Sequence, residues 1–303
     1  MKKSSLKSVS AGDRVFDAVL YFFFFIFAIL VVYPFWDTIM LSFANPLTAM
    51  RLNINLWNDE WSLSSYRYLL TRDGRVVTGY INTIIRTATV TFAMMVTTML
   101  GAYPLSKRNL PGRTYITFFF LIPMFFSGGL IPSYLLMRNL HLINTRWALI
   151  LPNIFGIFNM IIMRNYLMSL DSALEEAAFI EGANYAQIIT RIIVPLSSPV
   201  IATIALWTAV GQWNSWFDAL IYIQSNHLKV LQTLLRDMVA DTVSNNTNEA
   251  ASLAQFNKLN ERKISGPTVS SAMIVLTIGP IVVMYPFLQK YFVKGIMIGS
   301  LKG

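Results

Sequence analysis

The sequence predicts an all-α membrane protein with six transmembrane helices and a helix-turn-helix coupling loop on the cytoplasmic side. One observation is composition: hydrophobic residues make up 55% of the 303 residues, charged residues 13%, and the mean hydropathy is +0.53. Soluble domains carry roughly 25% charged residues. The other is that apolar residues form six long runs, each near the ~20 residues with which a helix crosses ~30 Å of hydrocarbon. The runs are 18–36, 87–106, 114–137, 147–163, 192–217 and 264–289.

Basic residues that flank the runs predict the orientation of the chain. Four basic residues precede the first run: Lys2, Lys3, Lys7 and Arg14. The connection 105–113 carries three more. By the positive-inside rule both segments face the cytoplasm. Six spans then return the carboxyl terminus to the same side. We therefore expect a multi-pass protein of the cell membrane with both termini in the cytoplasm.

The runs and their connections divide the chain into three regions. We expect a cytoplasmic amino terminus over 1–14, a six-span transmembrane domain over 15–292 and a cytoplasmic tail over 293–303. Within the domain, the coupling loop covers 167–199, and a polar outer loop covers 222–267.

Several functional classes are excluded by what the sequence lacks. The formal charge of +9 does not indicate nucleic-acid binding, because no soluble segment interleaves Lys and Arg with aromatic residues. Zero cysteines exclude disulfides and thiol ligands. His141 and His227 have no second ligand at metal spacing. The phosphate loop G-x-x-x-x-G-K-[ST] is absent from the sequence. We expect no catalytic residue, metal or cofactor in this chain.

The cytoplasmic loop carries the most specific local pattern. Ser172 and Glu175 predict a capping box that starts a helix. Gly182 suits the left-handed turn that ends such a helix. A second helix is expected over 184–194, ending at Pro195. The loop should therefore form a helix, a sharp turn and a second helix against the inner face of the membrane.

This loop resembles the EAA signature of inner-membrane permeases of ATP-binding-cassette importers, which reads Glu-Ala-Ala, three residues, Gly, nine residues, then Ile-x-Leu-Pro. The matching positions are Glu176, Ala177, Ala178, Gly182, Ile192 and Pro195, with Val194 where Leu is usual. The closing segment resembles that of maltose-type carbohydrate permeases, and its positions include Lys294, Gly295, Gly299 and Lys302. Within that family the chain is most similar to importers of complex oligosaccharides and polysaccharide fragments.

The resemblance implies a permease subunit that moves a carbohydrate inward, driven by ATP hydrolysis in partner subunits. The implied partners are a second homologous permease, two ATPase subunits that bind ATP and Mg²⁺, and an extracytoplasmic solute-binding lipoprotein. The loop would be the coupling helix that sits in a cleft of the ATPase. There Glu175 and Glu176 would offer charge, and the small Ala177 and Ala178 would allow close approach. The tail would reach toward the same interface.

Three alternatives to this interpretation stand beside it. The loop could be an ordinary interfacial helix. The chain could be a secondary active transporter, although few carboxylates lie in its runs to bind a coupling ion. A membrane scaffold without transport activity would have no need of a loop for a motor partner.

The fifth run ends in aromatics and amides, at Gln212, Trp213, Asn214 and Trp216. Sugars stack on aromatic rings while amides bind their hydroxyls, so this stretch is the candidate for the substrate path. An aromatic belt at the membrane interface explains the tryptophans as well.

Three charges lie within or beside the runs, at Asp37, Arg86 and Asp218. A charge in the bilayer is costly, so such residues usually face a partner or a wet cavity. We predict that Arg86 pairs with Asp37 or Asp218 near an outer gate. The alternative is that each side chain extends to the outer surface on its own.

Overall fold

The computed structural model describes residues 11–45, 56–247 and 266–300. Within these ranges the chain is helical, and its only β pairing is an isolated bridge between Ala44 and Trp61. The all-α prediction is confirmed for this part of the chain. Lys302 and most of the predicted amino-terminal segment 1–14 lie outside the described residues.

The chain divides into two compact units, of which the first contains 1–72 and 239–276. Its main element is α1 (Ala11–Ser42), most of whose apolar side chains are exposed, while Met40 near its end is buried. The short α3 (Ser64–Arg67) contacts the end of this helix, since the hydroxyls of Ser42 and Tyr66 lie 2.8 Å apart. In α3, the hydroxyl of Ser65 also donates to the hydroxyl of Thr268, at 3.0 Å.

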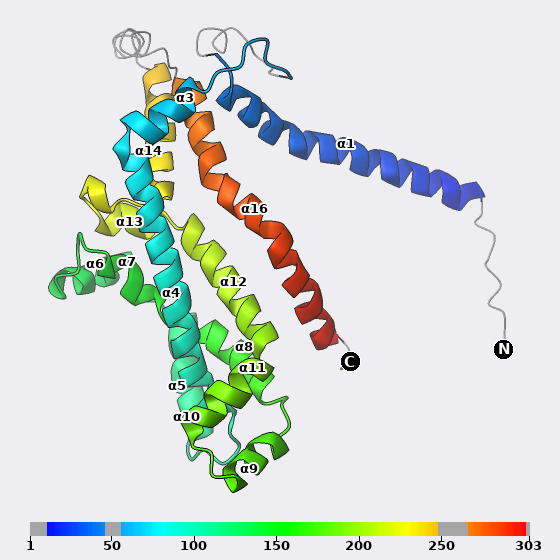
Figure 1. Cartoon of the computed structure of the whole chain (residues 1–303), viewed down its shortest axis with the longest axis vertical. Helices are drawn as coiled ribbons and strands as arrows, with labels where there is room; N and C mark the ends of the chain where they lie inside the picture. Colours follow the sequence, from blue (N-terminus) through cyan, green and yellow to red (C-terminus); the bar gives the residue numbers. More distant parts are fainter. Residues whose placement is uncertain (1–10, 46–55, 248–265, 301–303) are drawn as a thin grey trace. The chain divides into compact units, whose positions relative to one another are not determined.

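The second unit contains 73–238 and the chain after 276. Its long helix α4 packs along α12 and α8, as the ribbon shows (Figure 1). The core between these helices contains Met160, Met163 and Ile204, each fully buried. The elements are α4 (Gly74–Ser106), α5 (Arg113–Phe125), α6 (Leu130–Asn139), α7 (Trp147–Ile150), α8 (Ile157–Leu167), α9 (Ala173–Ile180), α10 (Tyr185–Ile188), α11 (Val194–Leu196), α12 (Ser198–Asn214), α13 (Phe217–Tyr222) and parts of α14 (Leu231–Thr247) and α16 (Gly266–Ser300).

Helix α4 begins at a side-chain cap. The carboxylate of Asp73 accepts the backbone N–H of Arg75 at 3.2 Å and forms a two-pronged contact with its guanidinium at 2.7 Å. This guanidinium holds the pKa of the Asp73 carboxyl below its ordinary value, against the opposing effect of burial. The cap satisfies an amide that the helix itself leaves without an acceptor.

In the part of the chain that the structure describes, three helices are long and apolar enough to cross a membrane: Gly12–Ser42, Gly74–Ser106 and Gly266–Met284. Three further pairs reach that length only as bent spans: Arg113–Phe125 with Leu130–Asn139, Trp147–Asn153 with Ile157–Leu167, and Tyr185–Leu196 with Ser198–Asn214. The count is six if each pair is one span, which is the predicted number.

The third predicted run, 114–137, is not one continuous helix. It bends by 108° between α5 and α6, and Gly129 in the break has a φ of +84°. The 13 residues of α5 rise by only about 20 Å, which is less than the ~30 Å of hydrocarbon. The prediction rested on hydropathy, which does not record a helix break at Gly128 and Gly129.

The last helix continues through the predicted start of the tail. Helix α16 runs from Gly266 to Ser300 without interruption, so Lys294, Gly295 and Gly299 lie in it. The backbone therefore shows no change at 292–293, and the role expected of the tail stays a prediction.

Candidate functional site

The predicted coupling loop forms a helix, a turn and a second helix at one end of the second unit (Figure 1). Helix α9 ends at Ile180, and Gly182, two residues later, has a φ of +85°. The N–H of Gly182 donates to the carbonyl of Phe179, and the N–H of Ala183 donates to that of Ala178, both at 3.0 Å. This is the Schellman geometry, in which a left-handed glycine satisfies the last carbonyls of a helix. The turn predicted at Gly182 is confirmed.

The capping box predicted at Ser172 is wrong. Ser172 has helical dihedrals and makes no side-chain cap, and Asp171 instead accepts the N–H of Ala173 at 3.0 Å. A reciprocal capping box is present one helix later, where the side chains of Asn184 and Gln187 each accept the other's backbone N–H at 2.9 Å. Both positions fit the sequence pattern of a capping box. The box at Ser172 does not form because Glu175 instead makes tertiary contacts.

The second helix does not end at Pro195. It continues from Tyr185 through a π-helical turn at Ile189–Ile193 to Leu196, and then bends by 80° into α12. Pro195 directly follows the π-helical turn, in the three-residue segment α11 that precedes the bend. Ile192 packs partly buried against the core of the unit.

The inner face of α9 is fixed to the rest of the unit by an ion pair. Glu175 contacts the ammonium of Lys107, and it accepts the hydroxyl of Tyr103 at 3.1 Å. The same ammonium lies 4.3 Å from the centre of the Tyr103 ring. Ala178 is buried in the core beside them, with 8% of its surface exposed. Of the two signature alanines, Ala178 thus packs inside the unit, and Ala177 is exposed.

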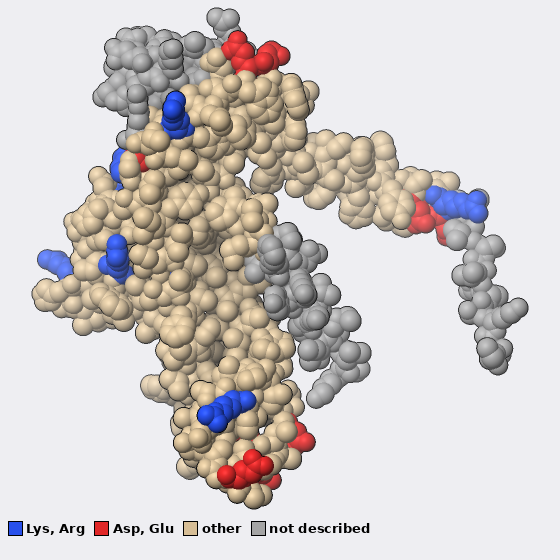
Figure 2. Space-filling model, viewed as in Figure 1, with Lys and Arg blue, Asp and Glu red and all other residues tan. Residues whose placement is uncertain are grey.

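The outer face of α9 is exposed and mixed in character. Glu176 and Ala177 lie on it, and Ile180 at its end exposes 88% of its surface. The Phe179 and Tyr185 rings meet edge to face across the turn at 5.1 Å, and both are also exposed. Acidic side chains gather at this end of the unit (Figure 2). A rigid knob with an apolar tip and acidic flanks is suited to a cleft of another protein.

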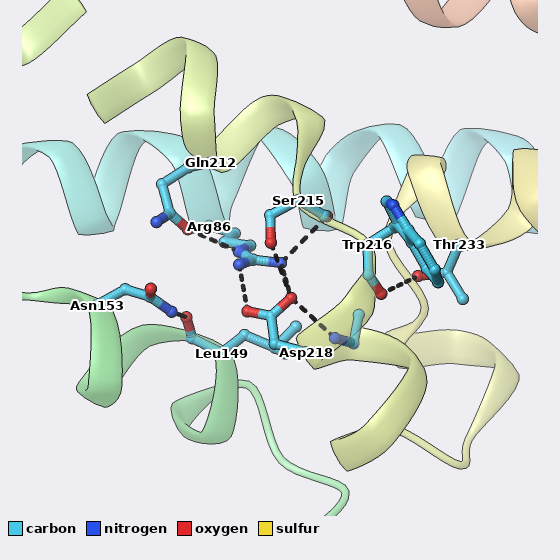
Figure 3. A network of polar contacts seen from close by, with 9 residues as sticks. Arg86, Leu149, Asn153, Gln212, Ser215, Trp216, Asp218 and Thr233 are labelled. Carbon is cyan, nitrogen blue, oxygen red and sulfur yellow. Dashed lines mark hydrogen bonds and ion pairs between the residues drawn. The ribbon is translucent and has the colours of Figure 1, made fainter. Parts of the chain in front are cut away.

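The second predicted site is a buried polar cluster around Arg86 (Figure 3). The guanidinium of Arg86 contacts both carboxylate oxygens of Asp218 and donates through Nε to the amide oxygen of Gln212 at 3.0 Å. Its Nη1 also faces the carbonyl of Ser215 at 3.4 Å. Arg86 is 3% exposed and Asp218 22% exposed. The contact predicted between these two residues is present, while Asp37 lies in the other unit and its pairing with Arg86 stays a prediction.

Sequence reasoning missed the polar neighbours of Arg86 on α4. The side chain of Asn82 donates to the carbonyls of His227 and Lys229 and accepts from Arg146 at 3.2 Å. Thr83 accepts the N–H of Leu231 at 2.9 Å. A polar set at positions 82, 83 and 86 in an otherwise apolar helix is the signal that could have found them, because these positions share one face.

The four residues predicted to line a substrate path do not converge on one space. Gln212 is engaged by Arg86, and the side-chain amide of Asn214 donates to its own helix at Val210. The ring of Trp216 lies 5.5 Å from the guanidinium carbon of Arg236 on α14. Trp213 alone among them lines a cavity of about 560 Å³ between α4, α12 and α16. The path stays a prediction.

Comparisons with known proteins place these features in a family. Residues 74–298 match the model of the binding-protein-dependent transport system inner membrane component. The polygalacturonan/rhamnogalacturonan transport system permease protein YtcP of Bacillus subtilis (strain 168) is 36% identical over 96% of this chain and 99% of its own length. Protein LplC of the same strain is 35% identical over 99% and 98%, respectively.

A solved structure supports the same assignment. The bacterial ABC transporter involved in the import of the acidic polysaccharide alginate has a chain that superposes with a TM-score of 0.85 at 33% identity. The match covers 93% of this chain and 98% of that one. This chain therefore belongs to the binding-protein-dependent transport system inner membrane components, as a non-catalytic permease subunit of an ABC importer.

Proposed function

We propose that this permease imports oligosaccharides released from polysaccharides. The support is that relatives named for polygalacturonan/rhamnogalacturonan and alginate import align with nearly the whole chain. The working assembly would contain this chain, a second homologous permease, two ATPase subunits that bind ATP and Mg²⁺, and an extracytoplasmic solute-binding lipoprotein. Both termini and α9 would lie on the cytoplasmic side.

Helix α9 and its turn are the proposed contact with the ATPase. The observation that carries this is the division of the helix into an anchored face and an exposed face: Glu175 and Ala178 hold it to the unit, while Ile180 is 88% exposed. Ile180 lies beside the exposed Phe179 and Tyr185, and a group of exposed apolar side chains marks an interaction surface. In the proposed cycle, closure of the ATPase dimer moves this knob, and the spans then open toward the loaded binding protein.

We propose that the Lys107–Glu175 contact transmits movement of α9 to the membrane helix α4. Lys107 directly follows α4, so a displacement of α9 acts on the end of a helix that also carries Arg86. At its other end, α4 holds the break between α12 and α13 through Arg86 and Asp218. We propose that this second ion pair steadies the outer gate.

Co-purification tests the coupling contact. The complex is isolated through a tag on this chain, and the amount of ATPase is compared between wild type and Ile180→Asp. Leu63→Asp is the matched control, since Leu63 is also exposed but lies in the connection between the first two predicted runs, far from the coupling loop in the sequence. We expect the ATPase to be lost only from Ile180→Asp. Equal ATPase in all three preparations would refute the contact.

ATPase stimulation tests the substrate class. The reconstituted complex is given binding protein loaded with oligogalacturonide, maltodextrin or a monosaccharide. The proposal expects stimulation by an oligosaccharide and none by the monosaccharide. Stimulation by the monosaccharide alone would contradict it while leaving the importer assignment intact.

A further inference from the structure

A cavity of about 460 Å³ lies where α4 ends, α5 begins and α8 ends. Three arginines line it from three different parts of the unit. Arg108 belongs to the connection after α4, Arg113 is the first residue of α5, and Arg164 lies in the last turn of α8. Residues 56 positions apart thus contribute positive charge to one space.

The positive charge of this cavity is not neutralised within the described part of the chain. The ion pairs among those residues involve other side chains, and none places a carboxylate within 4 Å of the three guanidiniums. Arg164 donates through its Nε alone, to the carbonyl oxygen of Leu105 at 2.9 Å. Arg113 donates to the sulfur of Met168 at 3.1 Å. Like charges in one cavity repel each other, so an anion between them would be stabilised.

The start of α5 adds uncapped backbone amides to the same cavity. Its N-cap is Gly112, which has a φ of +71° and no side chain to accept a hydrogen bond. Among the described residues no acceptor faces the N–H groups of Thr114 and Tyr115, and both residues line the cavity. Amides of a first helical turn favour phosphate oxygens.

Part of the remaining wall of the cavity is apolar. Phe118 and Leu121 line it one helical turn apart along α5, and Phe118 is 62% exposed. Helices α4 and α8 end here and α5 begins, so the predicted topology puts the arginines at the depth of the bilayer headgroups. A polar end at headgroup depth that continues into an apolar wall matches an amphiphile.

We propose that this cavity binds the phosphate headgroup of an anionic phospholipid, with an acyl chain along Phe118 and Leu121. The arginine forks and the amides of α5 would hold the phosphate oxygens. Inorganic phosphate shares the headgroup chemistry but leaves the apolar wall unused. The proposal concerns lipid binding and does not depend on the transported substrate.

Native mass spectrometry of the whole transporter tests this site. The complex is released from nanodiscs of phosphatidylcholine mixed with phosphatidylglycerol, and the phosphatidylglycerol retained per complex is measured. Variants are Arg108→Gln, Arg113→Gln and Arg164→Lys, with Arg191→Gln as the control. Arg191 is exposed in the coupling loop and does not line the cavity. We expect about fivefold weaker retention for each of Arg108→Gln and Arg113→Gln, and no change in the control.

Equal retention in wild type, Arg108→Gln and Arg113→Gln would overturn the proposal and leave the arginines with topology alone as their role. Binding of inorganic phosphate without any retention of phosphatidylglycerol would also overturn it, because the site would then bind a free anion. Arg164→Lys keeps the charge but loses the fork, so we expect weaker retention there, and retention equal to wild type would contradict the proposed contact of arginine forks with the phosphate. Arg108 and Arg113 donate to no backbone carbonyl among the described contacts, so their variants should assemble normally.

Discussion

Lys107, directly after α4, forms an ion pair with Glu175 in the first turn of α9, and Tyr103 contacts both. The pair joins the membrane helix to the loop that carries the EAA signature. Because the Lys107 side chain is only 35% exposed, loss of Glu175 would leave a partly buried ammonium without its partner. The contact is thus placed to transmit a displacement of α9.

The first prediction is that Glu175→Gln uncouples ATP hydrolysis from transport. We expect the coupling free energy to fall by about 0.5–2 kcal/mol, with less transport per ATP and an unchanged amount of assembled complex. Proteoliposome uptake and ATPase rate, measured together, check this. Glu181→Gln is the control, since that residue is exposed. The exchange Lys107→Glu with Glu175→Lys should restore part of the ratio, and failure to do so would argue against the pair.

The second prediction concerns the turn at Gly182. A Cβ there would meet no atom within 4 Å, so any penalty comes from the left-handed backbone alone. We expect Gly182→Val to cost about 1–2 kcal/mol and to reduce ATPase co-purification, whereas Gly182→Asn should cost less because Asn tolerates this conformation. The unfolding temperature and the yield of ATPase measure both effects. Equal behaviour of the two variants would mean that backbone strain is not the cause.

The third prediction separates stability from gating at Arg86. Asp218→Asn leaves a buried guanidinium without its counter-charge, which we expect to destabilise the chain by about 3–5 kcal/mol. Replacing both partners, as Arg86→Met with Asp218→Leu, should recover most of that stability. Thermal unfolding in detergent tests this part. If the pair steadies the gate, the double variant should fold yet hydrolyse ATP without binding protein; a low basal rate would remove the gating role.

The fourth prediction is a pH dependence that arises at Asp73. Its pKa is lowered in the folded chain by Arg75, so the carboxylate stabilises the fold above its unfolded pKa. That contribution declines below about pH 4 and is gone once the pH falls through the folded pKa. The unfolding temperature of wild type should therefore approach that of Asp73→Asn as the medium is acidified. Asparagine still caps the helix, so the comparison isolates the charge. A constant difference between the two proteins would contradict the assignment.

The sequence by itself determined the helical class, six apolar segments and the position of the coupling loop. These follow from local causes: hydrocarbon must be crossed by about 20 apolar residues, and a glycine after a helix favours a left-handed turn. That Arg86 pairs with Asp37 or Asp218 was also predictable, because few charges lie in the spans and each needs a partner. None of these inferences required knowing which helices are neighbours.

Only the tertiary structure decided how the predicted segments are used. The 108° break between α5 and α6 depends on backbone geometry that hydropathy does not record. Glu175 serves an ion pair rather than a capping box because Lys107, far from it in sequence, lies within its reach. Ala178 turns inward and Ala177 outward since packing fixes the rotation of α9. Arg108, Arg113 and Arg164 likewise line one cavity because helix packing brings together residues that are distant in sequence. Local pattern fixes what each segment forms, and packing fixes what each side chain contacts.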